Sequence, residues 1–218
     1  MGEKGKIMKK LPIGRSDFRD LIEENCFFID KSLFIKEILE EDSQIILLPR
    51  PRRFGKTLNL TMLRYFFEKT DSKEERKRLF KGLEIEKEKS FDEHFCKYPV
   101  IFLTFKDIKM SDFEENLEAI AILIADEFER HNYLLESQAL NENQKKRFTE
   151  ILTLTANLSI FKRSLLYLSQ YLYKHHKEKP VILIDEYDTP IHEAYIGKYY
   201  EKTIGFFRSF LGAGLKDN

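Results

Sequence analysis

The sequence contains two cysteines, has a net charge of zero at pH 7 and lacks long apolar runs. Its two cysteines, Cys26 and Cys96, lie far apart without metal-ligand spacing, which predicts two reduced, buried thiols in a cytosolic protein. The 37 basic and 37 acidic residues cancel, so the chain lacks the overall positive field of a dedicated nucleic-acid binder. No apolar run approaches the ~18 residues of a membrane span, and no apolar region follows the basic segment 1–10. We therefore expect a cytoplasmic protein with neither a secretory signal nor a membrane contact.

What the sequence does contain is the composition of a folded domain. Apolar residues make up 42% of the 218-residue chain, enough for a sizeable core, and charged residues make up 34%. We expect residues 1–14 to form a flexible lead-in and residues 15–218 to form one domain. The stretch 68–93 is dense in Lys and Glu, which is typical of a solvated helix and loop.

Short apolar runs alternate with stretches of helical periodicity. Continuous apolar sequence is typical of strands that are covered on both faces of a parallel sheet, which predicts strands over 45–48, 98–105 and 181–184. The spacing of apolar residues predicts a short helix after Ser16, a second from Asp30 or Ser32, and further helices over 57–67, 112–133 and 198–211, with others capped by Asn141 and Ser159. Gly212 and Gly214 are expected to end the last helix. The alternation predicts an α/β fold, a three-layer sandwich around a parallel sheet, incomplete toward its C-terminus.

The first predicted strand leads into a basic loop that ends in Gly55-Lys56-Thr57, and a helix follows. This order is typical of the phosphate-binding loop of nucleoside triphosphatases. Gly55 has no side chain to block the approach of a phosphate, and Lys56 can reach the β- and γ-phosphates as a point charge. Thr57 can place its hydroxyl on Mg²⁺. The loop therefore predicts binding of ATP with Mg²⁺.

The beginning of this loop departs from the usual pattern. Arg50 stands where the pattern has its first glycine, and Pro51 removes one N–H donor. Arg52 and Arg53 contact either phosphates or a neighbouring acid, or are simply solvated; the sequence leaves both readings open.

A second motif follows the third predicted strand. Asp185 ends the apolar run, at the sheet edge where ligands bind in open α/β folds, so it is placed to hold the shell of a Mg²⁺ ion. Glu186 comes next and could polarise the attacking water as a general base. Asp188 either orients water or metal, or caps the helix that follows. The histidines show no metal-ligand spacing.

Several segments together resemble the AAA-ATPase-like family, P-loop ATPases of bacteria and archaea that are often fused to a C-terminal nuclease domain of the PD-(D/E)xK type. The resemblance covers most of the chain and is carried by Leu11-Pro12-Ile13-Gly14, Phe28-Ile29-Asp30-Lys31-Ser32, Arg50-Pro51-Arg52-Arg53-Phe54-Gly55-Lys56-Thr57-Leu58 and Leu183-Ile184-Asp185-Glu186-Tyr187-Asp188-Thr189-Pro190-Ile191. In that family an arginine in place of the first glycine is usual, so Arg50 is similar to its counterparts there.

The resemblance implies roles for individual residues. It implies that Gly55, Lys56 and Thr57 bind the nucleotide phosphates and Mg²⁺, and that Asp185 and Glu186 serve the metal and the water. We expect the nucleotide site to extend over Arg52, Arg53, Phe54, Gly55, Lys56, Thr57 and Leu58, with Thr57 and Asp185 as metal residues and Lys56 and Glu186 as catalytic residues. The resemblance also implies, by analogy, that the segment 28–32 lies near the nucleotide base. Family members continue past residue 218 into a further strand, a sensor residue and the nuclease-like region.

Three functions stay open on this basis. The first is a Mg²⁺-dependent ATPase, active in the complete protein. The second is a nucleotide-binding switch that hydrolyses little, because no arginine finger or sensor is visible. The third is a nucleic-acid-associated module, through a C-terminal domain that this sequence lacks. A homo-oligomer and a purely structural domain also remain open.

Overall fold

The computed structural model describes residues 9–49 and 54–216 of the chain. The described chain is a mixed α/β protein that divides into two compact units, residues 1–97 and 98–218. Whether residues 15–218 behave as one domain stays a prediction.

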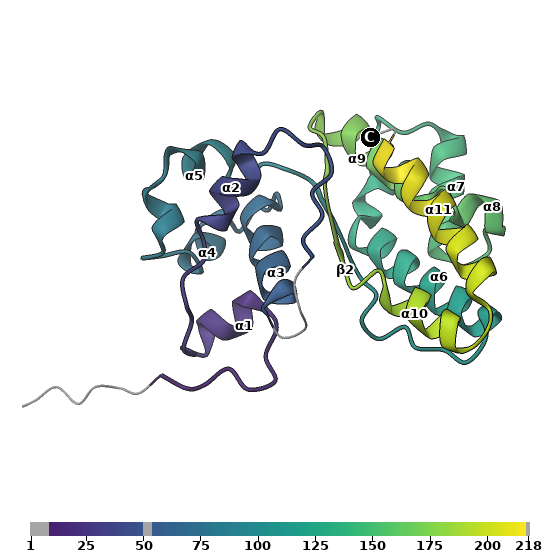
Figure 1. The fold of residues 1–218 in the computed structure, drawn as a ribbon. Coiled ribbons are helices and arrows are strands. Elements are labelled where there is room, and N and C mark those ends of the chain that lie inside the picture. Colours follow the sequence, from purple (N-terminus) through teal and green to yellow (C-terminus); the bar gives the residue numbers. More distant parts are fainter. Residues whose placement is uncertain (1–8, 50–53, 217–218) are drawn as a thin grey trace, which may run out of the picture. The chain divides into compact units, whose positions relative to one another are not determined.

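Unit 1 is helical. Its elements, in chain order, are α1 (Phe18–Glu23), α2 (Phe34–Glu40), α3 (Lys56–Phe67), α4 (Lys73–Arg78), the 3₁₀ helix η1 (Glu84–Lys87) and α5 (Lys89–His94) (Figure 1). The predicted helix over 57–67 is confirmed as α3, and the Lys- and Glu-rich stretch forms α4, η1 and α5. That stretch also contributes to the core, because Phe80, Ile85 and Phe91 are fully or almost fully buried.

The core of unit 1 is built from aromatic rings around α3. Phe66 makes edge-on contacts with Phe80, Phe91 and Phe95, whose ring centroids lie 5.6–5.8 Å from its own. Such edge-to-face pairs add to the stabilisation that burial of the rings already supplies. The helix that begins at Lys56 is therefore held firmly along its buried face.

The short helix α1 is docked onto α3 by hydrogen bonds as well as by packing. Asp17 caps α1 by accepting from the backbone N–H of Arg19, and both of its carboxylate oxygens lie 3.1 Å from the Tyr65 hydroxyl of α3. The next backbone N–H, that of Phe18, donates to the Thr61 hydroxyl at 3.0 Å. Since Thr61 lies one helical turn beyond Thr57, α1 begins beside the first turns of α3.

Unit 2 contains the strands β1 (Val100–Thr104) and β2 (Val181–Asp185), which confirms the second and third predicted strands (Figure 1). The strands pair in parallel, with Val100 opposite Val181 and Thr104 opposite Asp185. In the described part of the chain the sheet has these two strands, so a full three-layer sandwich is not observed. The helices are α6 (Phe113–Arg130), η2 (Asn132–Glu136), α7 (Glu142–Leu152), α8 (Leu158–Phe161), α9 (Ser164–His176), α10 (Thr189–Ile196) and α11 (Tyr200–Lys216).

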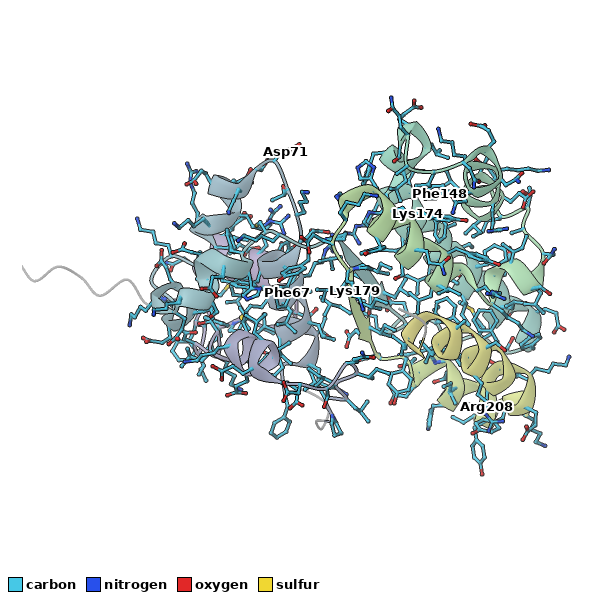
Figure 2. All side chains as sticks on the ribbon, turned by 90° about the horizontal axis from the view of Figure 1, so that it is seen from above. Phe67, Asp71, Phe148, Lys174, Lys179 and Arg208 are labelled. Atoms are coloured by element: carbon cyan, nitrogen blue, oxygen red, sulfur yellow. The ribbon has the colours of Figure 1, made fainter. Side chains whose placement is uncertain are left out.

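The core of unit 2 lies between one face of the strands and the helices α6, α9 and α11. Ile101 and Leu103 of β1 point into it and are almost fully buried. Phe148, labelled in Figure 2, is completely buried in the same core, whereas Arg208 on α11 is exposed. Close to the C-terminus α11 packs tightly on α9, because a Cβ atom on Gly214 would lie 2.4 Å from Cγ of Leu165.

The predicted strand over 45–48 is wrong. The segment has no strand structure, and Ile45, Ile46 and Leu47 are 54%, 37% and 66% exposed. A strand needs a neighbour for its backbone hydrogen bonds, and none of the described residues supplies one here. A short apolar run alone cannot specify that neighbour, so its composition indicated burial that the structure does not show.

Helix boundaries were predicted with mixed success. Asp112 and Asn141 cap α6 and α7, the latter through a complete capping box with Gln144. The expected cap at Ser159 is wrong, because Asn157 caps α8 instead. The expected end at Gly212 and Gly214 is also wrong, because α11 continues to Lys216. Glycine lowers helix propensity by only about 1 kcal/mol, which the packing of α11 outweighs.

Candidate nucleotide-binding site

The start of α3 has the local geometry of an anion-binding helix terminus. Gly55 occupies the N-cap position with φ +73°, a left-handed conformation that suits glycine. The first turn of α3 has no acidic residue, and its N-cap residue, Gly55, has no side chain that could cap the helix. The N–H groups of a first helical turn and the helix dipole together favour a negative ligand at such an end. Lys56 and Thr57, the first two residues of the helix, lie at this position.

Other residues predicted for the loop are placed only in part. Phe54 is 60% exposed, just before Gly55, and Leu58 is partly buried in the first turn of α3. Arg52 and Arg53, together with Arg50 and Pro51, lie outside the described residues. Their predicted contacts with phosphate therefore stay predictions.

The carboxylate predicted to serve the metal lies at the end of a buried strand. Asp185 is the last residue of β2 and is 2% exposed, and its backbone carbonyl accepts from the N–H of Phe105. Its register partner on β1 is Thr104, so both side chains point to the same face of the sheet. The Thr104 hydroxyl is buried and has no hydrogen-bond partner among the described residues.

Thr104, whose hydroxyl is unpaired among the described residues, is the residue at this sheet edge that the sequence analysis did not identify. The signal was present, because Thr104 is the one polar residue in the apolar run before Phe105. A buried hydroxyl beside a buried carboxylate fits a hydrated cation, one of whose water molecules would satisfy the hydroxyl. Among the described residues no cluster of three or more His, Cys, Asp or Glu side chains could hold a metal by itself.

Glu186 departs sharply from the direction of the strand. Its φ is +49°, a left-handed conformation that is uncommon for a residue with a Cβ atom. Its carboxylate accepts a long hydrogen bond, 3.4 Å, from the hydroxyl of Thr189 at the start of α10. The strand therefore ends abruptly, and Asp185 and Glu186 point in different directions. Asp188 occupies the N-cap position of α10 but makes no capping hydrogen bond with its side chain.

The segment 28–32 has a structural role in unit 1. Asp30 accepts from the backbone N–H groups of Ser32 and Glu84, each at 2.8 Å, and the buried Ser32 hydroxyl accepts from Ile85 at 3.1 Å. Partial burial alone would raise the pKa of Asp30, but these N–H donors and Lys87 lower it below the ordinary value. Asp30 and Ser32 thus fix the loop to η1. The predicted proximity of this segment to a nucleotide base stays a prediction.

Two buried side chains, Glu127 of α6 and His131 just beyond its last residue, bond to backbone groups at the outer edge of β1. The Glu127 carboxylate accepts from the backbone N–H of Phe102 at 2.9 Å, and Nε2 of His131 donates to the carbonyl of Val100 at 3.1 Å. Glu127 is 4% exposed, and Arg130 forms an ion pair with it. The hydroxyl of Tyr133 bridges Nδ1 of His131 and Nε2 of His176. Two of the backbone groups of β1 that face away from β2, the N–H of Phe102 and the carbonyl of Val100, are satisfied in this way.

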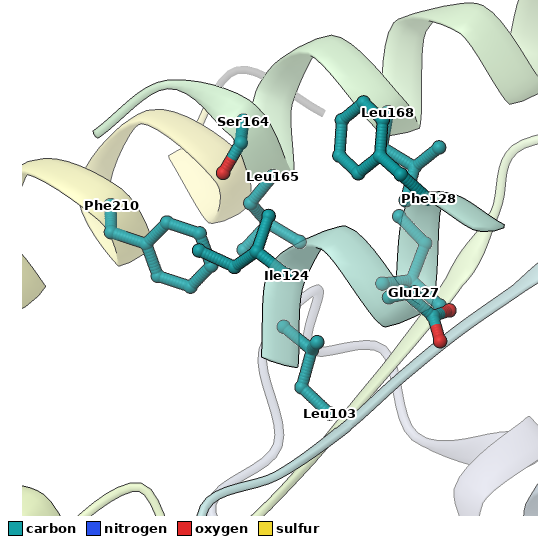
Figure 3. Close-up of a pocket in the computed structure, with 9 residues that line it drawn as sticks. Leu103, Ile124, Glu127, Phe128, Ser164, Leu165, Leu168 and Phe210 are labelled. Carbon is teal, nitrogen blue, oxygen red and sulfur yellow. The ribbon is translucent and has the colours of Figure 1, made fainter. Parts of the chain in front are cut away.

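Unit 2 also contains a small cavity between the strands and the helices (Figure 3). It is lined mainly by apolar side chains, among them Leu103, Ile124, Leu165 and Phe210. The carboxylate of Glu127 turns away from it toward β1. A small cavity with apolar walls cannot hold a nucleotide, because the phosphates of a nucleotide require polar partners.

Comparison with known proteins decides the family. The model of the "Predicted AAA-ATPase" family matches residues 12–218, almost the whole chain. The chain belongs to this family. Membership supports nucleotide binding and an ATPase-like function at a coarse level, in agreement with the resemblance carried by the motifs.

Relatives of this AAA-ATPase-like chain add little about its role. A protein of Azotobacter chroococcum mcd 1, named "Uncharacterized protein in vnfD 5'region", is 26% identical over 189 residues. The match covers 84% of this chain but 30% of the relative, so the chain spans under a third of that protein's length. No solved structure matches the chain. Across the described residues, helices long and apolar enough to cross a membrane are absent.

Proposed function

We propose that the chain binds ATP with Mg²⁺ through the start of α3. The observation that carries this proposal is the start of α3, which the chain enters through Gly55 in a left-handed conformation and which begins with Lys56 and Thr57. The backbone N–H groups of this turn bind the phosphates, and Lys56 neutralises charge on the β- and γ-phosphates. Family membership supports ATP as the nucleotide.

The second part of the proposal assigns the acidic strand end. Thr57 and Asp185 hold the shell of the metal, Asp185 through water that also satisfies the Thr104 hydroxyl. Glu186 orients and polarises the attacking water in the complete protein. Mg²⁺, when bound, neutralises charge on the phosphate oxygens. A three-layer sandwich with further strands, in which these elements belong to one parallel sheet, is the fold that this proposal implies.

Binding is tested by calorimetry with ATP, in the presence and absence of Mg²⁺. We expect Mg²⁺ to enhance binding by the unchanged chain, and Lys56→Ala to weaken it by at least about tenfold. Lys69→Ala is the matched control, since Lys69 is an exposed lysine just beyond the other end of α3. Equal binding by the Lys56 and Lys69 variants would contradict the proposal.

Hydrolysis is separated from binding by a second pair of variants. Glu186→Gln should keep ATP affinity and reduce turnover by about 100-fold or more in a complete, active protein, because it removes the general base. Asp185→Asn should weaken Mg²⁺-dependent binding itself. If Glu186→Gln leaves turnover unchanged, the assignment of the base is wrong while ATP binding stands. Measured binding without turnover by the complete protein would favour the nucleotide-binding switch.

A further inference from the structure

Two side chains of unit 2 form a chain of hydrogen bonds between backbone groups that are far apart in the sequence. The Tyr199 hydroxyl donates to the carbonyl of Met110, with 2.7 Å between the oxygens. Because its proton is used there, the hydroxyl oxygen accepts from Nδ2 of Asn116 at 3.3 Å. The second Nδ2 hydrogen is donated to the carbonyl of Pro190, also at 3.3 Å. The direction of every bond in this chain is therefore determined.

The bonded groups belong to the segments that follow the two strands. Met110 lies in the loop after β1, and Pro190 lies in the first turn of α10, which follows β2. Asn116 is in the first turn of α6, and Tyr199 immediately precedes α11 (Figure 1). Because β1 and β2 run parallel, both segments leave the sheet at the same end. The hydrogen bonds thus connect the two segments beyond the strand ends.

Both side chains of this chain are held closely. Asn116 is 1% exposed, although an amide is costly to bury. Its Oδ1 has no hydrogen-bond partner among the described residues, so the amide contributes through the two bonds of Nδ2. The Tyr199 ring packs against Gly197, where a Cβ atom would lie 2.5 Å from Cε1 of the ring and 3.1 Å from the carbonyl oxygen of Ser111. Neither side chain has room to move away from its partners.

The turn that contains Glu186 lies between two anchored residues. On one side the carbonyl of Asp185 accepts from the N–H of Phe105, and on the other side the carbonyl of Pro190 accepts from Asn116. Between them Glu186 has a φ of +49°. A residue with a Cβ atom keeps this left-handed conformation only where the surrounding structure holds it. Without the bond to Pro190, the turn could relax at its α10 end.

We propose that Asn116 and Tyr199 are positioning residues, which hold the turn 186–189 and thereby fix the direction of the Glu186 carboxylate. Both act through the backbone at Pro190, and neither needs to contact a nucleotide. The expected effect on turnover rests on the proposed function, in which Glu186 polarises the attacking water. The expected effect on the turn itself does not depend on a nucleotide.

Hydrogen exchange of the chain without nucleotide tests whether these residues hold the turn. The N–H of Thr189 donates to the carbonyl of Glu186 at 3.0 Å, so its exchange rate reports how often the turn opens. Tyr199→Phe and Asn116→Ala each break the chain of hydrogen bonds and leave buried polar groups unpaired. We expect each variant to exchange the Thr189 N–H at least about fivefold faster than the unchanged chain.

Tyr171→Phe is the matched control. It removes another buried hydroxyl of unit 2, which accepts from Arg147, and should change the exchange of the Thr189 N–H by less than about twofold. Circular dichroism shows whether each variant is folded. Unchanged Thr189 exchange in folded Tyr199→Phe and Asn116→Ala, or equal acceleration by Tyr171→Phe, overturns the proposal.

Turnover by a complete, active protein tests the catalytic consequence. Tyr199→Phe should lower kcat about tenfold or more and keep ATP affinity within about twofold, because it disturbs the direction of the base and leaves the phosphate contacts in place. Adding Tyr199→Phe to Glu186→Gln should cause no further loss, since no base is left to position.

The same measurements distinguish two failures. If Glu186→Gln leaves turnover unchanged, the base assigned in the proposed function is wrong, and the catalytic part of the positioning role is wrong with it, whereas the exchange result stands. If Glu186→Gln lowers turnover and Tyr199→Phe does not, the base is correct and the positioning role is wrong.

Discussion

The backbone N–H of Phe102 in β1 donates to the buried carboxylate of Glu127 in α6, with 2.9 Å between the nitrogen and Oε1. Glu127→Ala would leave this N–H unpaired and remove the ion pair with Arg130. We expect the free energy of unfolding to fall by about 2–4 kcal/mol. Chemical denaturation measures the loss. Asp126→Ala is the control, because Asp126 is the preceding residue of α6 and is exposed; equal losses for the two variants would show that the buried carboxylate has no special role.

Two glycines in helical settings should respond to alanine in opposite ways. Gly55 has φ +73°, so Gly55→Ala forces a left-handed alanine and should reduce stability by about 1–2 kcal/mol even without nucleotide. Gly205 lies within α11, and a Cβ atom added to it would meet no other atom within 4 Å, so Gly205→Ala should increase stability by about 0.5–1 kcal/mol. Thermal or urea unfolding of both variants provides the measurement. A stabilising Gly55→Ala would mean that α3 does not begin in the geometry described.

Asp30 should make unit 1 sensitive to acid. The pKa of Asp30 is lower in the folded chain than its ordinary value of 3.8, although its partial burial acts in the opposite direction. A carboxylate with a lowered folded pKa stabilises the fold at neutral pH, and this contribution disappears as the pH falls from about 4 through the folded pKa. The difference in stability between the unchanged chain and Asp30→Asn should accordingly shrink between pH 7 and about pH 3. Asp42→Asn, at an exposed position, should show no comparable change.

Both cysteines should be unreactive in the folded chain. Cys26 and Cys96 are free and buried, and burial raises the pKa of the Cys96 thiol to about 11. Since the thiolate is the reactive species, Ellman's reagent at pH 8 should modify neither thiol until denaturant is added. Rapid modification of native protein would show that the region around Phe66, whose carbonyl accepts from the N–H of Cys96, opens readily.

The parts of the fold that the sequence predicted correctly are those specified locally. The helix from Lys56 to Phe67 and the helix capped by Asp112 carry their own apolar spacing and end signals. The run Ile45–Leu48 failed for the opposite reason, because a strand depends on a partner elsewhere in the chain. The capping signals of Asn157 and Ser159 are nearly equivalent two residues apart, so only packing decides between them.

The same distinction holds for the candidate site. Gly55 and Asp185 could be named because their motifs place them at the start of a helix and at the end of a strand. Glu127 was missed because acidic residues in an amphipathic helix are usually solvated. Its position was nevertheless readable: it follows Ile124 by three residues and precedes His131 by four, on the buried face of α6. The place of the Thr104 hydroxyl beside Asp185 follows from the register of the two strands, which the sequence alone does not specify.

Gly214 has a consequence for the interior of unit 2. It lies one turn after Phe210 on α11, and the Leu165 side chain it contacts lines the same small cavity as Phe210 (Figure 3). The absence of a single methyl group thus determines how closely two helices approach and how much empty space they enclose. A larger residue at this position would act as a spacer, opening room for a small inert guest such as xenon where the native chain leaves almost none.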